Sequence, residues 1–305
     1  MRFISLAAAI IAFAATSALA QPSLSGKSQP AIDQPAPPMW SITDADSEIF
    51  ILAAIHVLPA GTKWRSPAVN RAMDAAEAVW FEADDESADA QAKAREIFAG
   101  DGTNADSVKL TSMLSTADAM SLVVIANDLA APAGAFDAMR PWAVFLTLSV
   151  QAVVKEGYDP GAGLSREILT EAHARGREIG YFNTIDDQLR AFTTMTPAEE
   201  LEAASYIIEN WGAERAKLPG AVEAWRTGDI AALESLVNAP LREGAPAVFQ
   251  KVVLDQTGPL ADKIEGLLDG KGTVLAVIGA SYLVGEGSIL EQLENRGVTV
   301  ERVSN

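Results

Sequence analysis

Three short apolar runs constrain the fold of this chain more than any other feature of its sequence. They read EIFILAAIH (48–56), AVWFEAD (78–84) and TVLAVIGA (273–280). Short continuous runs rich in Val, Ile and aromatic residues are typical of buried strands. The flanking sequence has the spacing and punctuation of helices. The chain therefore has to enclose a sheet between helices.

The first two of these runs belong to a longer predicted unit. MWSIT (39–43) precedes the first run across the acidic turn DADS, and this arrangement predicts a β-hairpin. Ser66 and Pro67 then open a helix, because Ser caps a helix and Pro is tolerated at its first position. That helix leads directly into 78–84. A strand–helix–strand unit of this kind predicts a parallel pair with a right-handed crossover.

The rest of the chain reads mainly as helices, with further short strands at 177–184 and 298–303. We therefore expect an α/β (α+β) fold. It has a mixed central sheet of about six strands, flanked by many helices, with a large helical section in the middle. The helices are predicted at 86–99, 107–114, 116–130, 141–155, 164–175, 196–217, 219–226, 229–238, 245–255, 259–269 and 286–296.

The N-terminus has the pattern of a secretory signal peptide over residues 1–20, with an apolar run that ends in small residues. Residues 21–38 are rich in Pro, Ser and Gln and predict a flexible linker. Residues 39–305 then form a single domain. We expect a periplasmic or secreted protein with no membrane span once the signal is cleaved. With no cysteine, a disulfide framework is excluded.

The formal net charge of −18 limits the classes of partner. Nucleic acids and anionic membrane surfaces both require clustered cations on the protein. We therefore expect neither partner, and we read the acidity mainly as favouring solubility.

Polar groups follow each of the three apolar runs. His56 ends the first run, Glu82 lies near the end of the second, and Gly279 to Tyr282 follow the third. In open α/β sheets, ligands bind beyond the C-terminal ends of the strands, so neighbouring strands would bring these groups together. A neutral imidazole and a carboxylate can bind a divalent metal or share a proton as acid and base.

Each of these residues also has a structural interpretation. His56 can be a hydrogen-bonded strand-end residue, and Glu82 can belong to an acidic helix N-terminus. The other histidine, His173, reads as a surface residue near a helix C-terminus. Ser281 lacks the Gly-x-Ser-x-Gly spacing of a hydrolase nucleophile. The glycines around it lack the order of a nucleotide-binding loop.

The order of these motifs resembles the TraB/GumN (PrgY-like) family. The resemblance runs from Trp40 to Val303 and rests on four segments. They are Ala53-Ala54-Ile55-His56, Glu82 at the end of its strand, Arg140-Pro141-Trp142 in mid-chain, and Val277-Ile278-Gly279-Ala280-Ser281-Tyr282-Leu283-Val284-Gly285 near the end.

This resemblance implies a metal-dependent hydrolase of the peptidase type. Animal relatives, the TIKI proteins, are metal-dependent proteases that use two Gly-x-x-His motifs and a glutamate. By resemblance, His56 and Glu82 would hold a divalent metal, which would polarise a carbonyl and activate water. Tyr282 would join them as a catalytic residue. The predicted substrate-binding residues are Arg140, Trp142, Asn183, Gly279 and Ser281.

The chain departs from the family pattern at the presumed site. The first-motif glycine is Ala53, the second-motif histidine is Tyr282, and a usual glutamate is Asn183. Gln256 occupies part of a usual Arg-Asn pair. Losing a ligand usually abolishes a catalytic zinc site, which needs three protein ligands.

Two hypotheses follow, with a third held in reserve. In the first, His56 and Glu82 bind metal or act as acid and base, and Tyr282 orients substrate or stabilises an oxyanion. In the second, which the departures favour, the chain is a pseudoenzyme that binds a peptide or glycan without turnover. The third is an iron or haem site formed by Tyr282 and His56.

Overall fold

The computed structural model describes residues 35–59, 61–105, 107–159 and 163–305. The predicted signal peptide and residues 21–34 of the predicted linker lie outside the described residues. Residues 35–38 of that linker are packed against the fold. The N–H of Ala36 donates to the Arg226 carbonyl at 2.7 Å, and the Pro38 carbonyl accepts from Ala53 at 2.8 Å. Packing therefore begins before Met39.

The described residues contain one mixed sheet, as predicted, with the strand order β4-β3-β5-β2-β1-β6. Strands β2, β5, β3 and β4 run parallel. Strand β1 is antiparallel to both β2 and β6, so the predicted N-terminal hairpin is confirmed. The bounds are β1 Met39–Thr43, β2 Ser47–Ala54, β3 Ala78–Ala83, β4 Glu178–Asn183, β5 Gly272–Gly279 and β6 Glu301–Arg302.

One predicted pairing is wrong. Strands β2 and β3 are parallel, but they are not neighbours, because β5 lies between them. Ala276 of β5 is in register with Ile51 on one side and Trp80 on the other. Strand β5, which lies near the C-terminus of the chain, pairs with both β2 and β3. Local sequence patterns cannot reveal such a long-range pairing. The strand predicted at 298–303 is reduced to the short β6.

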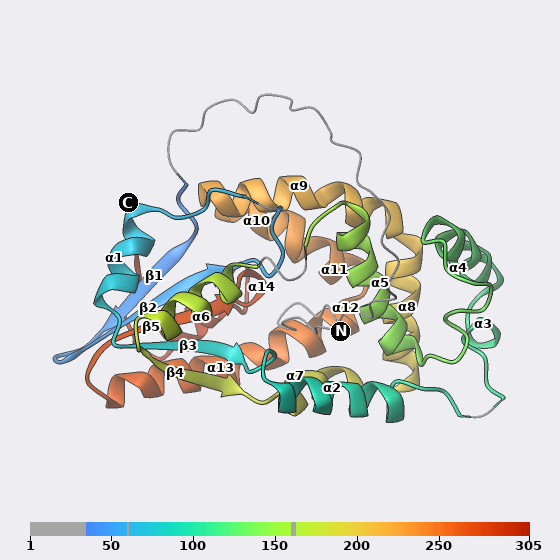
Figure 1. The fold of residues 1–305 in the computed structure, drawn as a ribbon, viewed down its shortest axis with the longest axis horizontal. Helices are drawn as coiled ribbons and strands as arrows, with labels where there is room; N and C mark the ends of the chain where they lie inside the picture. The colour runs from blue at the N-terminus through green and yellow to red at the C-terminus, as the bar shows by residue number, and fades with distance from the viewer. Residues whose placement is uncertain (1–34, 60, 106, 160–162) are drawn as a thin grey trace.

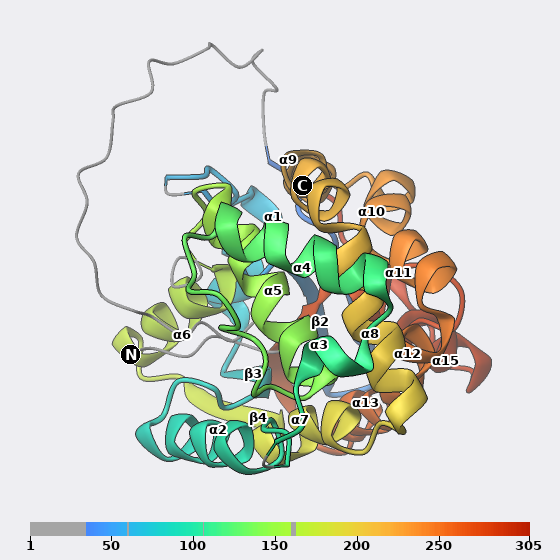
Figure 2. The same ribbon diagram turned by 90° about the vertical axis from the view of Figure 1, so that its right-hand side faces the viewer.

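Helices cover the sheet on both sides. Helix α1 packs on β5, and α6 packs on β3 and β4. Figure 2 shows α6 and α15 on opposite sides of the strands. Helix α1 begins as predicted, with Pro67 at its start and the Ser66 hydroxyl accepting from Val69 N–H at 3.2 Å. The bounds are α1 Pro67–Ala75, α6 Leu164–Ala174, α13 Asp255–Glu265 and α15 Ile289–Asn295.

Most of the remaining helices form the predicted helical section beyond one end of the sheet, while the end of α9 and α10 pack on the hydrophobic cluster of the sheet (Figure 1). Among the described residues, no helix is both long enough and apolar enough to cross a bilayer. The bounds are α2 Ala88–Gly100, α3 Leu110–Met113, α4 Thr116–Asp128, α5 Pro141–Lys155, α7 Ile185–Thr193, α8 Pro197–Glu209, α9 Trp211–Thr227, α10 Ile230–Val237, α11 Ala239–Gly244 and α12 Pro246–Phe249. A π-helical turn, η1, covers Gln250–Leu254, and a short 3₁₀ turn covers Gly266–Asp269.

The break between α8 and α9 differs from the prediction. The sequence predicts one helix that ends near residue 217 and another that starts at 219, and a proline normally interrupts a helix. Instead the break falls at Asn210, and α9 continues through Pro219. Ala221 and Trp225 after the proline are buried. Their packing outweighs the local cost of the ring.

Two hydrophobic clusters meet in the middle of the molecule. One is centred on the sheet and the other on α5, α7 and α8. Leu241 and Val252 pack against both clusters. The arrowheads of β2, β3 and β4 in Figure 1 point toward this junction. The C-terminal ends of the strands therefore face the helical section.

Candidate functional site

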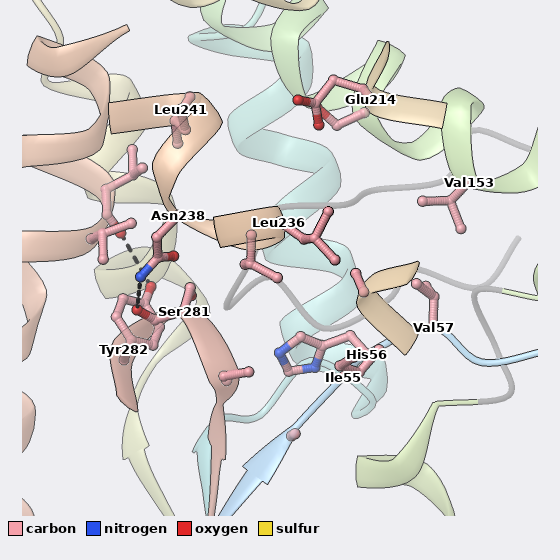
Figure 3. Close-up of a pocket in the computed structure, with 18 of the residues that line it drawn as sticks. Ile55, His56, Val57, Val153, Glu214, Leu236, Asn238, Leu241, Ser281 and Tyr282 are labelled. Atoms are coloured by element: carbon pink, nitrogen blue, oxygen red, sulfur yellow. Dashed lines mark hydrogen bonds between the residues drawn. The ribbon is translucent and has the colours of Figure 1, made fainter. Parts of the chain in front are cut away.

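A cavity of about 260 Å³ lies at this junction (Figure 3). Its walls come from both hydrophobic clusters, and most of the lining side chains are apolar. The polar lining residues are His56, Glu82, Ser149, Asn183, Gln188, Glu214, Lys217, Asn238, Gln256, Ser281 and Tyr282. Sites at such junctions, apolar with a few convergent polar groups, are typical of ligand binding.

The sheet topology brings three of the predicted site residues together. His56 follows the end of β2, Glu82 lies near the end of β3, and Gly279 ends β5. Because β5 lies between β2 and β3, these three residues meet at one edge of the sheet. We refer to His56, Glu82 and Gly279 as the cavity floor.

His56 is held by the backbone packed around it. The loop after β2 forms a β-bridge between Leu58 and Asp159. Gly163 then passes so close that a Cβ atom there would lie 2.2 Å from the His56 carbonyl oxygen. Only glycine fits this approach. The segment after β2 is thereby fixed, with the imidazole of His56 buried.

Only one of the two carboxyl oxygens of Glu82 has a hydrogen-bond partner. Its Oε1 accepts a hydrogen bond from the N–H of Gly279. Its Oε2 is buried and has no hydrogen-bond partner, and the same holds for both ring nitrogens of His56. His56 Nε2 and Glu82 Oε2 are 4.0 Å apart, which is too far for a direct hydrogen bond.

Burial controls the charge of both side chains. Desolvation lowers the pKa of His56 to about 4. Desolvation also raises the pKa of Glu82 well above its usual range; the Gly279 N–H opposes that shift and the charge of Asp85 adds to it. Both shifts favour the uncharged forms. The cavity floor is therefore a pair of neutral hydrogen-bonding groups rather than an ion pair.

Tyr282 is committed to other contacts. Its hydroxyl donates to the Val252 carbonyl of η1 at 3.3 Å. The side-chain amide of Asn238 holds the same turn, donating to Ser281 O at 2.9 Å and Val284 O at 3.0 Å. Figure 3 shows Tyr282 beside Ser281 and Asn238 rather than beside His56. Burial, with the nearby Glu82 carboxyl, raises the pKa of Tyr282, so the phenol stays neutral.

The donor set does not fit a catalytic metal centre. Such centres use three protein ligands, and the floor offers one imidazole and one carboxyl. Across the part of the chain that the structure describes, no group of three or more His, Cys, Asp or Glu residues could hold a metal ion. The neutral hydroxyl of Tyr282 is already hydrogen-bonded and is a poor third ligand. For the same reason the Tyr282 hydroxyl is not free to bind the iron of the predicted iron or haem site.

Two predicted substrate-binding residues lie elsewhere. Arg140 forms an ion pair with the buried Glu200 and donates to the Asp101 carbonyl at 3.2 Å. Trp142 is fully buried, and its indole N–H donates to the same carbonyl at 3.2 Å. Neither residue lines the cavity. The contacts of Arg140 and Trp142 hold the start of α5 in place. A substrate contact stays a prediction for both residues.

The other predicted residues do reach the cavity. Asn183, Gly279 and Ser281 line it, as does Gln256. Asn183 Oδ1 accepts from Lys263 Nζ at 2.6 Å. Three of the four departures from the family pattern therefore share one cavity, namely Asn183, Gln256 and Tyr282. Ala53 is buried in β2 and is not among the lining residues.

The sequence did not single out several lining residues. Gln188 contributes a buried Oε1 without a partner. Asn238 supports the turn at Ser281, and Glu214 pairs with Lys217 at 2.7 Å. These residues come from α7, α9 and the end of α10. No motif surrounds Asn238 or Glu214, so only the three-dimensional arrangement reveals these two residues.

The fold and the site together define an α/β chain with a cavity beyond the ends of its parallel strands. Over residues 38–302 the sequence matches the TraB/PrgY/gumN family. The chain belongs to this family, which confirms the family resemblance. Comparison with curated proteins gave no match, and comparison with solved structures gave none either.

Proposed function

We propose that this chain is a member of the TraB/PrgY/gumN family that binds a ligand in its cavity without metal-dependent turnover. One observation carries the proposal: His56 and Glu82 at the cavity floor keep three polar atoms without partners, and the described residues supply no third ligand residue. We further propose that the protein acts outside the cytoplasm, in accord with the predicted signal peptide over residues 1–20.

The lining of the cavity supports binding. A buried polar group without a partner costs about 1–3 kcal/mol, and folded proteins rarely keep several in one place. His56 and Glu82 keep three such atoms at the floor. A ligand that bonds to them recovers this cost. The peptide or glycan expected from the sequence stays a prediction, and the apolar walls favour a ligand with apolar surface.

The second candidate is the metal-dependent hydrolase that the family resemblance implies. The meeting of His56 and Glu82, with Nε2 and Oε2 4.0 Å apart, favours it. A metal centre here would still need a donor that the described residues do not supply. For this reason we place it second.

Metal content separates the two candidates. The test is elemental analysis of the purified protein after incubation with Zn²⁺, alongside His56→Ala. His173→Ala is the matched control, because His173 is the other of the chain's two histidines and lies on the exposed surface of α6. We expect no stoichiometric zinc in any of the three proteins. Stoichiometric zinc that His56→Ala loses and His173→Ala keeps would overturn the proposal.

A further inference from the structure

The unpaired polar atoms of this molecule are concentrated in one place. Among the described residues, five buried side-chain nitrogen or oxygen atoms have no hydrogen-bond partner. Four of them belong to cavity-lining residues: Nδ1 and Nε2 of His56, Oε2 of Glu82 and Oε1 of Gln188. The fifth is Nε of Arg177, away from the cavity. This concentration indicates a binding site rather than scattered packing defects.

Nε2 of His56 and Oε2 of Glu82 specify what the ligand has to offer. The two atoms are 4.0 Å apart and both lack partners, so one head group can contact both. The Oε1 atom of Glu82 accepts from Gly279, so the neutral carboxyl donates from Oε2, and a ligand that accepts this bond and donates to Nε2 satisfies both atoms. A carboxylate only accepts and an ammonium only donates, so neither provides both bonds.

The remaining charge in the cavity also disfavours an ion. Lys217 is the one cation among the described residues that line it, and its ammonium is paired with Glu214. In the view of Figure 3, Leu236 lies between Glu214 and His56. An anion at the floor would therefore lack a counter-ion, and burying it unpaired is costly.

The walls between these polar groups are apolar. They include Ile55, Val57, Phe145, Val153, Phe192 and Leu236. A water molecule occupies about 30 Å³ in the liquid, so a cavity of about 260 Å³ is far larger than one water needs. Apolar walls give water few partners, whereas an aliphatic chain gains by leaving solvent.

We propose that the cavity binds an aliphatic molecule with one uncharged head group that both donates and accepts hydrogen bonds, such as a primary amide. The head group contacts His56 and Glu82, and the aliphatic body lies along Leu236 and Val153. This inference rests on the proposed function and names the ligand class of the same site.

Calorimetric titration with four probes of similar length tests the inference. Octanamide donates and accepts, octanoate only accepts and is anionic, octylammonium only donates, and 2-nonanone accepts without charge. We expect octanamide to bind about tenfold more tightly than each of the others, because each of these leaves a buried group unpaired.

Two variants locate the binding. Leu236→Trp enlarges an apolar wall residue and leaves the floor residues unchanged, and we expect it to abolish octanamide binding. Val124→Trp is the matched control, because Val124 is 67% exposed on α4 and lies away from the cavity. Its affinity should equal that of the unmodified protein. Thermal unfolding of both variants verifies that they are folded.

The results have distinct meanings. Equal or tighter binding of any other probe overturns the ligand class, and so does the absence of binding by all four. Octanamide binding that survives Leu236→Trp also overturns it. The proposed function fails by a different result, namely stoichiometric zinc that depends on His56.

Discussion

Two buried polar clusters of this chain lie in segments that resemble family motifs, and they differ in how their atoms are bonded. At the start of α5, Arg140 and Glu200 pair with each other, and Trp142 and Arg140 both donate to the Asp101 carbonyl. At the cavity floor, three polar atoms of His56 and Glu82 have no partner. The first cluster is complete within the chain, and the second is not.

This difference separates structural polar residues from binding residues. A complete cluster contributes to stability, and removing one member exposes the full cost of burying the other. An incomplete cluster costs stability in the free protein, and proteins keep such costs chiefly where function needs them. The comparison predicts opposite responses to substitution, and the following tests probe it from the largest expected effect to the smallest.

Removing Arg140 should cause the largest loss. Glu200 is 3% exposed, so Arg140→Ala leaves a buried carboxylate without its partner. We expect the free energy of unfolding to fall by about 4 kcal/mol. Chemical denaturation measures it, with Lys93→Ala as the control for an exposed ion pair, where the loss should be about 0.5 kcal/mol. Equal losses of unfolding free energy in Arg140→Ala and Lys93→Ala would show that the cluster at the start of α5 is no more stabilising than an exposed ion pair.

His56 should make the protein sensitive to acid. Its pKa is about 4 in the folded chain and 6.5 as the ordinary value, so the unfolded chain takes up the proton first. Stability therefore falls as pH drops from about 6.5 to about 4, by about 3 kcal/mol in total. His56→Asn should lose this component and His173→Asn should keep it. Identical denaturation profiles for the two variants would contradict the burial of a neutral His56.

Asn238 tests whether bonding or location decides the response. It lines the cavity, but its side-chain amide donates to two carbonyls. Asn238→Ala should therefore lower the free energy of unfolding by about 2 kcal/mol, as a complete cluster would. Denaturation of this variant at neutral pH is the measurement. An unchanged or increased stability would mean that location in the cavity, rather than bonding, is what matters.

Glu82 should respond in the opposite direction to His56. Burial raises the pKa of Glu82 above its ordinary value of 4.5. The contribution of the protonated carboxyl to the free energy of unfolding is therefore complete below about pH 4.5 and falls as the pH rises above it. The slope is at most about 1.4 kcal/mol per pH unit. Glu82→Gln keeps an acceptor for the Gly279 N–H and removes the titration, so it should be more stable than the unmodified protein near pH 7. A loss of stability there would show that the carboxyl is satisfied after all.

Much of the fold was predictable because strand and helix signals are local. The apolar runs, the hairpin and the Ser66-Pro67 helix start all follow from neighbouring residues. The insertion of β5 between β2 and β3 was not predictable, because it pairs β5 with β2 residues 225 positions away and with β3 residues 196 positions away and needs no local signal. The continuation of α9 through Pro219 likewise depends on packing by distant residues.

The site was predictable only where strands carry it. His56, Glu82 and Gly279 end their strands or lie near the ends, so they meet once the three strands are neighbours, whichever strand lies in the middle. Glu214 and Leu236 lie on helices whose positions depend on tertiary packing, and no sequence motif marks either residue. The resemblance to the family also marked Arg140 and Trp142 without showing that their polar atoms bond within the chain.

The most direct test of the central claim is a crystal structure of the protein grown with both Zn²⁺ and octanamide, with anomalous data collected at the zinc edge. The claim is that the unpaired atoms of His56 and Glu82 serve a hydrogen-bonding ligand. It predicts amide density against Glu82 Oε2 and the His56 ring, with no anomalous peak between them. An anomalous peak coordinated by His56 and Glu82 would contradict it.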